Sequence, residues 1–319
     1  MASLSQGAGS SALVIAHLTG ETATLGRFQQ PGRSGLAREL RRASGGRSTR
    51  SGDGVVSLSV LVPSSRTWLD EAAALSGPRL LNRLVRGLLA GLARLGLAAS
   101  YPGRDFVLVN GRRVAYAALS REASGVLIFQ AVLAVEATYV TAEREPSWPG
   151  LPAAPEPTWL ARERGSAPDF ATLSAALAAG FAERFALELD ESALSSAEQS
   201  ALSTAVPSPL VDATLAGLAS SGSVAIPIGE LEALAALDAQ GRLARVRLRG
   251  DWMAALPELE SLETALVGES PESARVRELC ADWLARPASL VVGLTDAAML
   301  ADAIVRGARA YSEVSRSSD

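Results

Sequence analysis

The hairpin at residues 105–119 constrains the fold more than any other part of the chain. Two β runs, DFVLV and RRVAYAAL, lie on either side of Asn110-Gly111. Asn-Gly is a strong signal for a two-residue turn, and such a turn joins strands that run antiparallel. A doubly wound parallel sheet would not use this connection, so we expect at least part of the sheet to be antiparallel.

Further β runs and two long helical patterns complete the first part of the chain. Leucines recur at helical spacing over 78–96, and an apolar stripe extends over 169–187. We expect sheet strands at residues 12–18, 22–29, 55–63, 105–109, 112–119 and 125–136. The predicted fold class is therefore α+β, with a mixed β-sheet and helices packed against it.

A second domain is expected near residue 206, where the sequence reads Val-Pro-Ser-Pro. At 319 residues the chain is long enough for two domains, which we place at 1–205 and 206–319. Beyond the boundary we expect a strand at 243–248 and helices after Gly250-Asp251-Trp252, at 272–285 and at 296–311. The segment 144–168 holds six prolines and is too Pro-rich for helix; it could cover a site or merely run over the surface.

Composition excludes several classes of protein. Apolar residues make up 48% and charged residues 20% of the chain, which indicates a folded globular protein. No stretch approaches the roughly 18 apolar residues of a membrane span. With a net charge of −4 and dispersed arginines, no nucleic-acid partner is expected. The N-terminus lacks a signal-peptide pattern and Cys280 is the single cysteine, so the expected location is cytoplasmic.

The absence of lysine limits the chemistry further. All 30 basic residues are arginine, so no step can use a lysine as base, nucleophile or phosphate clamp. His17 is the single histidine, which excludes histidine-based triads and sites with several histidine ligands. We therefore expect no metal site built into the chain.

Residues 41–59, RRASGGRSTRSGDGVVSLS, contain the strongest candidate binding site. Glycines allow a backbone to approach a ligand closely, and arginines offer forked donors to phosphate or carboxylate. The loop at Ser44, Gly45 and Gly46, next to Arg41 and Arg42, could therefore hold an anion. The alternative is a solvated surface loop rich in Arg, Gly and Ser.

This stretch also resembles the signature of the lipoate–protein ligase A family, RRxSGGGAVYHDxGNxNxS, within the biotin/lipoate ligase superfamily. The matching positions are Arg41, Arg42, Ser44, Gly45, Gly46, Gly54 and Ser59. Arg47 stands where the family has its third loop glycine, and Ser51 and Gly52 replace its His-Asp pair.

Other segments resemble the same family in the same order. Residues 22–30 are similar to the strand ending "LGRxQ" beside the acyl-adenylate pocket, here with Arg27. In the hairpin, Asn110 matches the residue of the family pattern, and Arg113 stands at the position of the family lysine that holds carboxylate and phosphate. Strand 125–136 replaces "LLHHGTLLL" of the family, with Ile128, Phe129, Gln130 and Ala131 in place of its His-Gly-Thr part. The GDW segment is similar to the small C-terminal domain.

The resemblance implies a fold, a reaction and a site. The fold would be a biotin/lipoate ligase-like (class II synthetase-like) domain followed by a lipoate-ligase accessory domain. The reaction would use ATP, with Mg as its counter-ion, and lipoate to form lipoyl-adenylate, then transfer the acyl group to a lysine of a lipoyl-carrier domain protein. Arg113 would be the catalytic residue, and the ligand-binding residues would be Arg27, Arg41, Arg42, Ser44, Gly45, Gly46 and Asn110.

Two hypotheses remain open. The chain could be a divergent lipoate or octanoate ligase that uses Arg113, or a ligase-like binding protein that no longer makes adenylate. Arginine does not replace a lysine that bridges two anions, because its charge is spread over a planar fork. Loss of one preorganised electrostatic contact costs about 10²–10³ in rate. We favour the non-catalytic hypothesis, with a role in binding a lipoyl or acyl group or its carrier.

Overall fold

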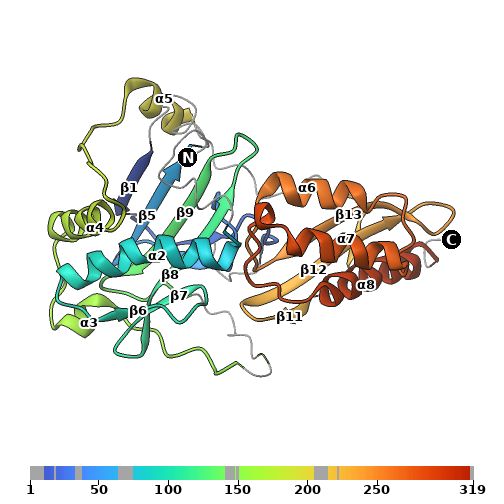
Figure 1. Ribbon diagram of the computed structural model, residues 1–319, viewed down its shortest axis with the longest axis horizontal. Coiled ribbons are helices and arrows are strands. Elements are labelled where there is room, and N and C mark those ends of the chain that lie inside the picture. Colours follow the sequence, from blue (N-terminus) through green and yellow to red (C-terminus); the bar gives the residue numbers. More distant parts are fainter. Residues whose placement is uncertain are drawn as a thin grey trace.

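The computed structural model describes residues 11–17, 19–32, 38–63, 75–140, 148, 151–204, 215–220 and 223–316. Figure 1 shows two units side by side along the long axis, each with its own sheet and helices. None of the described helices is both long and apolar enough to span a membrane.

The N-terminal unit is built on a six-stranded sheet in the order β1-β5-β9-β8-β7-β6. Every neighbouring pair in this sheet is antiparallel. The strands are β1 Ala12–His17, β5 Val55–Val62, β6 Ala99–Ser100, β7 Phe106–Val109, β8 Arg112–Arg121 and β9 Leu127–Ala134. The predicted hairpin is confirmed, because β7 and β8 pair around Asn110 (φ 51°) and Gly111 (φ 75°), both in the left-handed region that a tight hairpin turn requires.

Two helices cover one face of this sheet (Figure 1). They are α2, Gly77–Arg94, and α4, Phe170–Phe185, which confirms the helices expected from the leucine and phenylalanine spacing. Phe129 of β9 contacts Phe181 of α4 with ring centroids 6.2 Å apart. The two helices cross closely, because a side chain on Gly180 would come within 2.2 Å of the backbone nitrogen of Gly91.

A separate three-stranded sheet corrects the expectation that 22–29 belongs to the main sheet. Strand β2, Thr22–Leu25, lies between β3, Glu39–Arg41, and β4, Thr49–Ser51. Strand β2 ends at Leu25, because the next N–H, that of Gly26, donates to the Gln29 side chain at 2.7 Å and the chain turns there. The parallel pairing of β2 with β3 occurs in this small sheet, so the main sheet itself is not mixed.

The Pro-rich segment is only partly described, from residue 151 onward and at 148. It was expected to contain no helix, but a short helix, α3, forms at Leu160–Arg164. This part lies between Pro157 and Pro168, so no proline interrupts its hydrogen bonds. A further helix, α5, occupies Ser196–Thr204.

The C-terminal unit is a four-stranded antiparallel sheet with helices against it (Figure 1). Its strands are β10 Ala219–Ser220, β11 Val224–Ile226, β12 Gly229–Leu237 and β13 Leu243–Gly250; its helices are α6 Leu256–Ala265, α7 Ala274–Ala285, the 3-10 turn η3 Pro287–Ser289 and α8 Ala297–Arg316. The strand and the three helices expected here are present. The boundary placed at 205–206 falls among residues 205–214, outside the described part, and stays a prediction.

Candidate functional site

The glycine loop at residues 44–46 lies on the face of the six-stranded sheet opposite α2 and α4. The backbone N–H of Ser44 donates to the Gln130 side chain at 3.0 Å, and Gln130 Nε2 donates to Ser59 Oγ at 3.1 Å. Gln130 follows Phe129, whose ring faces α4, so the alternation along β9 places the loop on the opposite side. These three polar residues are buried, and together they seat the loop on β9 and β5.

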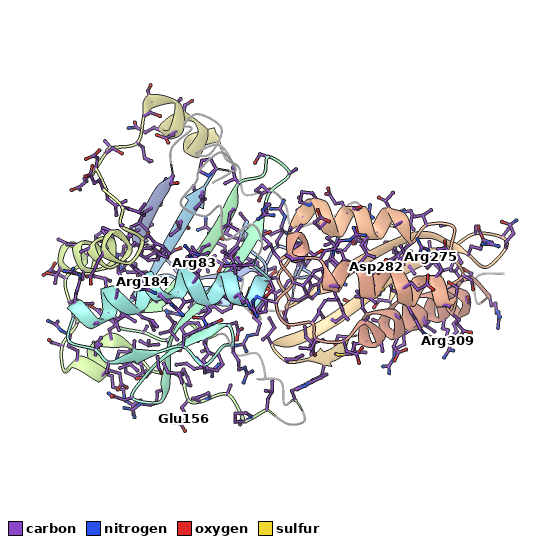
Figure 2. The ribbon with its side chains drawn as sticks, in the orientation of Figure 1. Arg83, Glu156, Arg184, Arg275, Asp282 and Arg309 are labelled. Atoms are coloured by element: carbon purple, nitrogen blue, oxygen red, sulfur yellow. The ribbon has the colours of Figure 1, made fainter. Side chains whose placement is uncertain are left out.

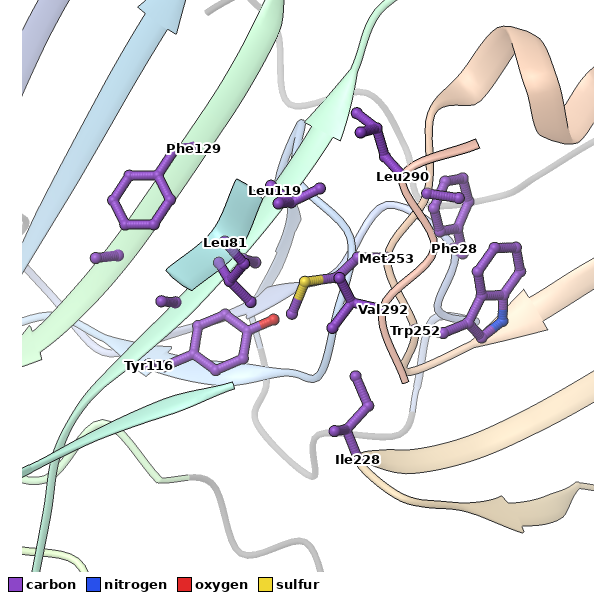
Figure 3. Packing of buried hydrophobic residues seen from close by; sticks show 14 of the residues in the cluster. Phe28, Leu81, Tyr116, Leu119, Phe129, Ile228, Trp252, Met253, Leu290 and Val292 are labelled. Atoms are coloured by element: carbon purple, nitrogen blue, oxygen red, sulfur yellow. The ribbon is translucent and has the colours of Figure 1, made fainter. Parts of the chain in front are cut away.

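The two glycines bring the loop against the rest of the chain. Gly46 N donates to the carbonyl oxygen of Trp252 at 2.9 Å. A β-carbon on Gly45 would lie 2.7 Å from that same oxygen, and one on Gly46 would lie 1.6 Å from the Tyr116 hydroxyl. Figure 3 shows Tyr116, Met253 and Trp252 in this region. The close approach predicted for these glycines is therefore present, but the partner is protein backbone and a tyrosine.

Arg42 is 8% exposed and its guanidinium donates to oxygens of the chain itself. Its Nη1 donates to Thr24 Oγ1 at 2.9 Å and Thr49 Oγ1 at 3.1 Å, as well as to the Thr24 carbonyl. Its Nη2 donates to the carbonyls of Gly45, at 3.3 Å, and Arg47. The guanidinium carbon also lies 5.1 Å from the centre of the Tyr116 ring. The hydrogen bonds of Arg42 thus connect the three-stranded sheet to the glycine loop.

Arg41 and Arg27 hold the turn that follows β2. Arg41 Nη1 donates to the carbonyl oxygens of Arg27 at 2.6 Å and Gln29 at 2.7 Å. Arg27 forms an ion pair with Glu122, and both side chains are largely buried. The structure therefore brings Arg27, Arg41 and Arg42 to the loop, as expected, and uses each of them to stabilise backbone or a carboxylate.

An ion pair beside the loop was missed by the sequence analysis. Arg47 Nε donates to Asp105 Oδ2 at 2.7 Å, and the Asp105 side chain is fully buried. The two residues are 58 positions apart, and no local pattern connects them. Within the described part of the chain, Asp105 Oδ1 and Ser44 Oγ are buried without a hydrogen-bond partner. The loop therefore retains hydrogen-bonding capacity that the protein does not use.

Arg113 lies on β8, 3% exposed, and contacts the Pro-rich segment. A shift in the β7–β8 register between Val107 and Leu108 places Arg113 opposite Leu108, on the side of Phe106 and Tyr116. Its Nε donates to the Pro155 carbonyl at 2.5 Å, and its guanidinium carbon lies 5.9 Å from the Phe106 ring centre. Arg113 thus points to the face that carries the loop, where it stabilises residues 155–158.

Asn110 lies in the hairpin turn and belongs to a different cluster. Its side chain donates to Glu163 at 2.8 Å, and Glu163 also accepts hydrogen bonds from Arg112 and Thr158. Burial alone would raise the pKa of Glu163, but these hydrogen bonds outweigh it and lower that pKa to about 2. No hydrogen bond joins Asn110 to the loop among the described residues, so the structure does not bring this expected ligand residue to the others.

A cavity of about 440 Å³ opens beside the turn, between Arg27 and the C-terminal unit. Its lining includes Phe28, Arg247, Arg249 and Glu263. Glu263 accepts a hydrogen bond from Arg247 at 3.0 Å and lies 3.7 Å from Arg249, so its charge is compensated within the cavity wall. No group of three His, Cys, Asp or Glu side chains that could hold a metal ion occurs in the described residues.

Comparison with known proteins shows the fold. No family model matches the sequence, and no curated protein does. The structure is similar to P. falciparum LipL1 in complex with lipoate, with a TM-score of 0.51, 12% identity, and coverage of 86% of this chain and 81% of that chain. It is also similar to a bi-partite lipoate protein ligase from Thermoplasma acidophilum (TM-score 0.45, 15% identity, 60% and 77% coverage) and to a biotin protein ligase from Aquifex aeolicus (0.30, 13%, 53% and 70%). The expected biotin/lipoate ligase fold is therefore confirmed.

Proposed function

We propose that this chain is a lipoate–protein ligase-like protein that does not form acyl-adenylates and instead binds a lipoyl or related acyl group, or the carrier domain that bears it. One observation carries the loss of chemistry. The guanidinium of Arg42 donates to oxygens of Thr24, Thr49, Gly45 and Arg47. To bind an anion, Arg42 would have to break these hydrogen bonds. Exchanging satisfied buried hydrogen bonds for a ligand is costly.

The adenylation step demands a cation between two anions. Carboxylate and α-phosphate repel each other, and a compact ammonium between them lowers the barrier. The chain has no lysine to supply one. Arg113 has the charge, but its Nε already donates to Pro155 and its planar group does not match a bridging ammonium. A reduction of about 10²–10³ in rate is expected from this change alone.

The residues around the loop do not fit ATP with its magnesium ion. Arg113, at the position of the family lysine, and Arg42, an expected ligand-binding residue, both have internal acceptors. Asp105 beside the loop is paired through Oδ2 with Arg47, and the described residues hold no group of three His, Cys, Asp or Glu side chains that could bind a metal ion. ATP, Mg and lipoate would be required only if the chain were active.

A retained binding role is supported by the surroundings of the loop. A small apolar cluster of Leu61, Val126 and Ile128 lies apart from the main core and contacts Ala43, next to Ser44. Apolar side chains beside an unused polar oxygen, Ser44 Oγ, are the kind of lining that an acyl group requires, and all four residues, the three of the cluster and Ser44, are buried in the structure. A cytoplasmic lipoyl-carrier domain is the partner we propose.

The alternative is an active lipoate or octanoate ligase. It is favoured by the position of Arg113 on the same side of β8 as Tyr116, whose hydroxyl donates to the Gly45 carbonyl at 3.1 Å. In this case the charge of Arg113 would act despite its different shape.

An ATP–pyrophosphate exchange assay with lipoate and with octanoate distinguishes the non-catalytic proposal from the active-ligase alternative. We expect background exchange from the wild type and from Arg113→Lys, and measurable binding of a lipoylated carrier domain in calorimetry. Arg112→Lys is the matched control, since Arg112 adjoins Arg113 but pairs with Glu163. Robust exchange by the unmodified protein would overturn the proposal, and absence of carrier and lipoamide binding would remove the binding role.

A further inference from the structure

We propose that a hollow between α2 and the end of α4 is a docking surface for an acidic segment of a partner protein. The hollow has a volume of about 630 Å³. Its lining includes three arginines of α2, Arg79, Arg83 and Arg86, and Arg184 from the last turn of α4. It lies on the outer side of the helices, away from the glycine loop.

Helical spacing brings the α2 arginines onto one stripe. Residues 79, 83 and 86 follow the i, i+4, i+7 pattern, so their side chains point the same way. Figure 2 shows Arg83 and Arg184 on neighbouring helices. The close crossing of these helices at Gly91 and Gly180 leaves little room for them to shift, so the backbone positions that carry the four arginines are fixed relative to one another.

Three of the four arginines have no neutralising partner within the described part of the chain, and Arg83 makes a further interaction. Arg79, Arg86 and Arg184 are exposed, and none has a hydrogen bond or ion pair within the described residues. Glu183, on the rim, is already paired with Arg94 at 2.6 Å. A local excess of positive charge in a chain of net charge −4 attracts anions and speeds their encounter.

The dimensions favour carboxylates on a protein over a small phosphate ligand. Seven residues of helix separate Arg79 from Arg86, about 10 Å, which is longer than a single phosphate group. Arg79, Arg86 and Arg184 are exposed to solvent, whereas a dedicated phosphate site encloses its ligand. Arginine forks match carboxylates in pairs, and the half-buried Phe185 and Leu75 offer apolar contact at the same place. An acidic helix with carboxylates at i, i+4 and i+7 fits this pattern.

Two labelled helical peptides test the inference by fluorescence anisotropy with the full chain. One has glutamates at i, i+4 and i+7 on a single face, and the other has the same composition with the glutamates on different faces. We expect the single-face peptide to bind more tightly, and its affinity to fall as salt rises. The triple change Arg79→Glu, Arg86→Glu, Arg184→Glu should weaken it by about tenfold or more.

A charge-matched control removes the general effect of a lower net charge. It is the triple change Arg277→Glu, Arg286→Glu, Arg306→Glu, at three exposed arginines of the C-terminal unit. We expect this control to bind the peptide within about threefold of the wild type. Equal losses in both triple variants, no preference between the peptides, or tighter competition by pyrophosphate or ATP than by the peptide would each overturn the inference.

Discussion

The hydroxyl oxygen of Tyr116 lies 1.6 Å from the position that a β-carbon on Gly46 would take. The same hydroxyl donates to the Gly45 carbonyl and receives a long contact from Arg42 at 3.4 Å. The tyrosine, the arginine and the two glycines therefore form one packed unit on the sheet. In this unit the motif stabilises the chain itself.

Replacing Gly46 with alanine should destabilise the fold. Gly46 has φ +84°, which disfavours any side chain, and the added methyl would collide with a buried hydroxyl. We expect a loss of about 2–4 kcal/mol in the free energy of unfolding, measured by urea denaturation. Gly96→Ala is the control, because Gly96 has φ +79° and open space around it, so it should lose only about 1 kcal/mol. Similar losses in both variants would show that the Tyr116 contact is not tight.

The buried pair Arg47–Asp105 makes a second prediction. Arg47→Met leaves the fully buried Asp105 carboxylate without its cation, which should cost about 3–5 kcal/mol. Adding Asp105→Leu removes the stranded charge and should recover much of this loss, as a double-mutant cycle would record. The exposed pair Arg275–Glu278 is the comparison, and its removal should change stability by less than about 0.5 kcal/mol. If the losses of unfolding free energy from Arg47→Met and Asp105→Leu were additive, the two residues would not be coupled as we propose.

Local signals predicted local structure, and the arginines, Ser44 and the two glycines of the motif do lie together. Asn110-Gly111 specified the hairpin because the turn geometry depends on those two residues alone. The order of Arg41, Arg42 and the glycines placed them on one loop. Their actual partners could not be predicted, because Asp105 and Trp252 reach the loop only through the tertiary fold. Whether the motif binds an anion is decided by these partners.

Strand β12 shows the opposite case, in which local preference fails. Its sequence, GELEALAAL, consists mostly of helix-forming residues and was not expected to be a strand. It is central in the C-terminal sheet, paired on both sides, and α8 packs on it so closely that a β-carbon on Gly307 would lie 2.4 Å from the Ala233 carbonyl. Burial between the neighbouring strands and α8 outweighs the helix propensity of these residues, and a single sequence does not show which elements will surround a segment.

The cluster at Glu163 predicts an acid-dependent contribution to stability. Its folded pKa of about 2 lies below the value for an unfolded glutamate, so the stabilisation is complete above about pH 4.5 and is lost as the pH falls toward 2. Glu163→Gln should therefore be less stable than the wild type at pH 7, and the difference should shrink between pH 4.5 and 2. Urea unfolding across this range measures it, with Glu188→Gln as the control for removing one exposed carboxylate. A difference that stays constant with pH would contradict the cluster's role.

Cys280 provides a reporter of the C-terminal unit. The side chain is fully buried on α7, and burial raises the pKa of its thiol to about 12. The reactive thiolate is therefore scarce at pH 8 and cannot meet a reagent from solvent. We expect the native protein to react with a thiol reagent such as Ellman's reagent only as fast as the C-terminal unit opens, and at once in concentrated urea. Because Cys280 is the single cysteine, the reaction has one phase and needs no assignment. Rapid labelling without denaturant would show that α7 is not packed as described, and Cys280→Ser should abolish all labelling.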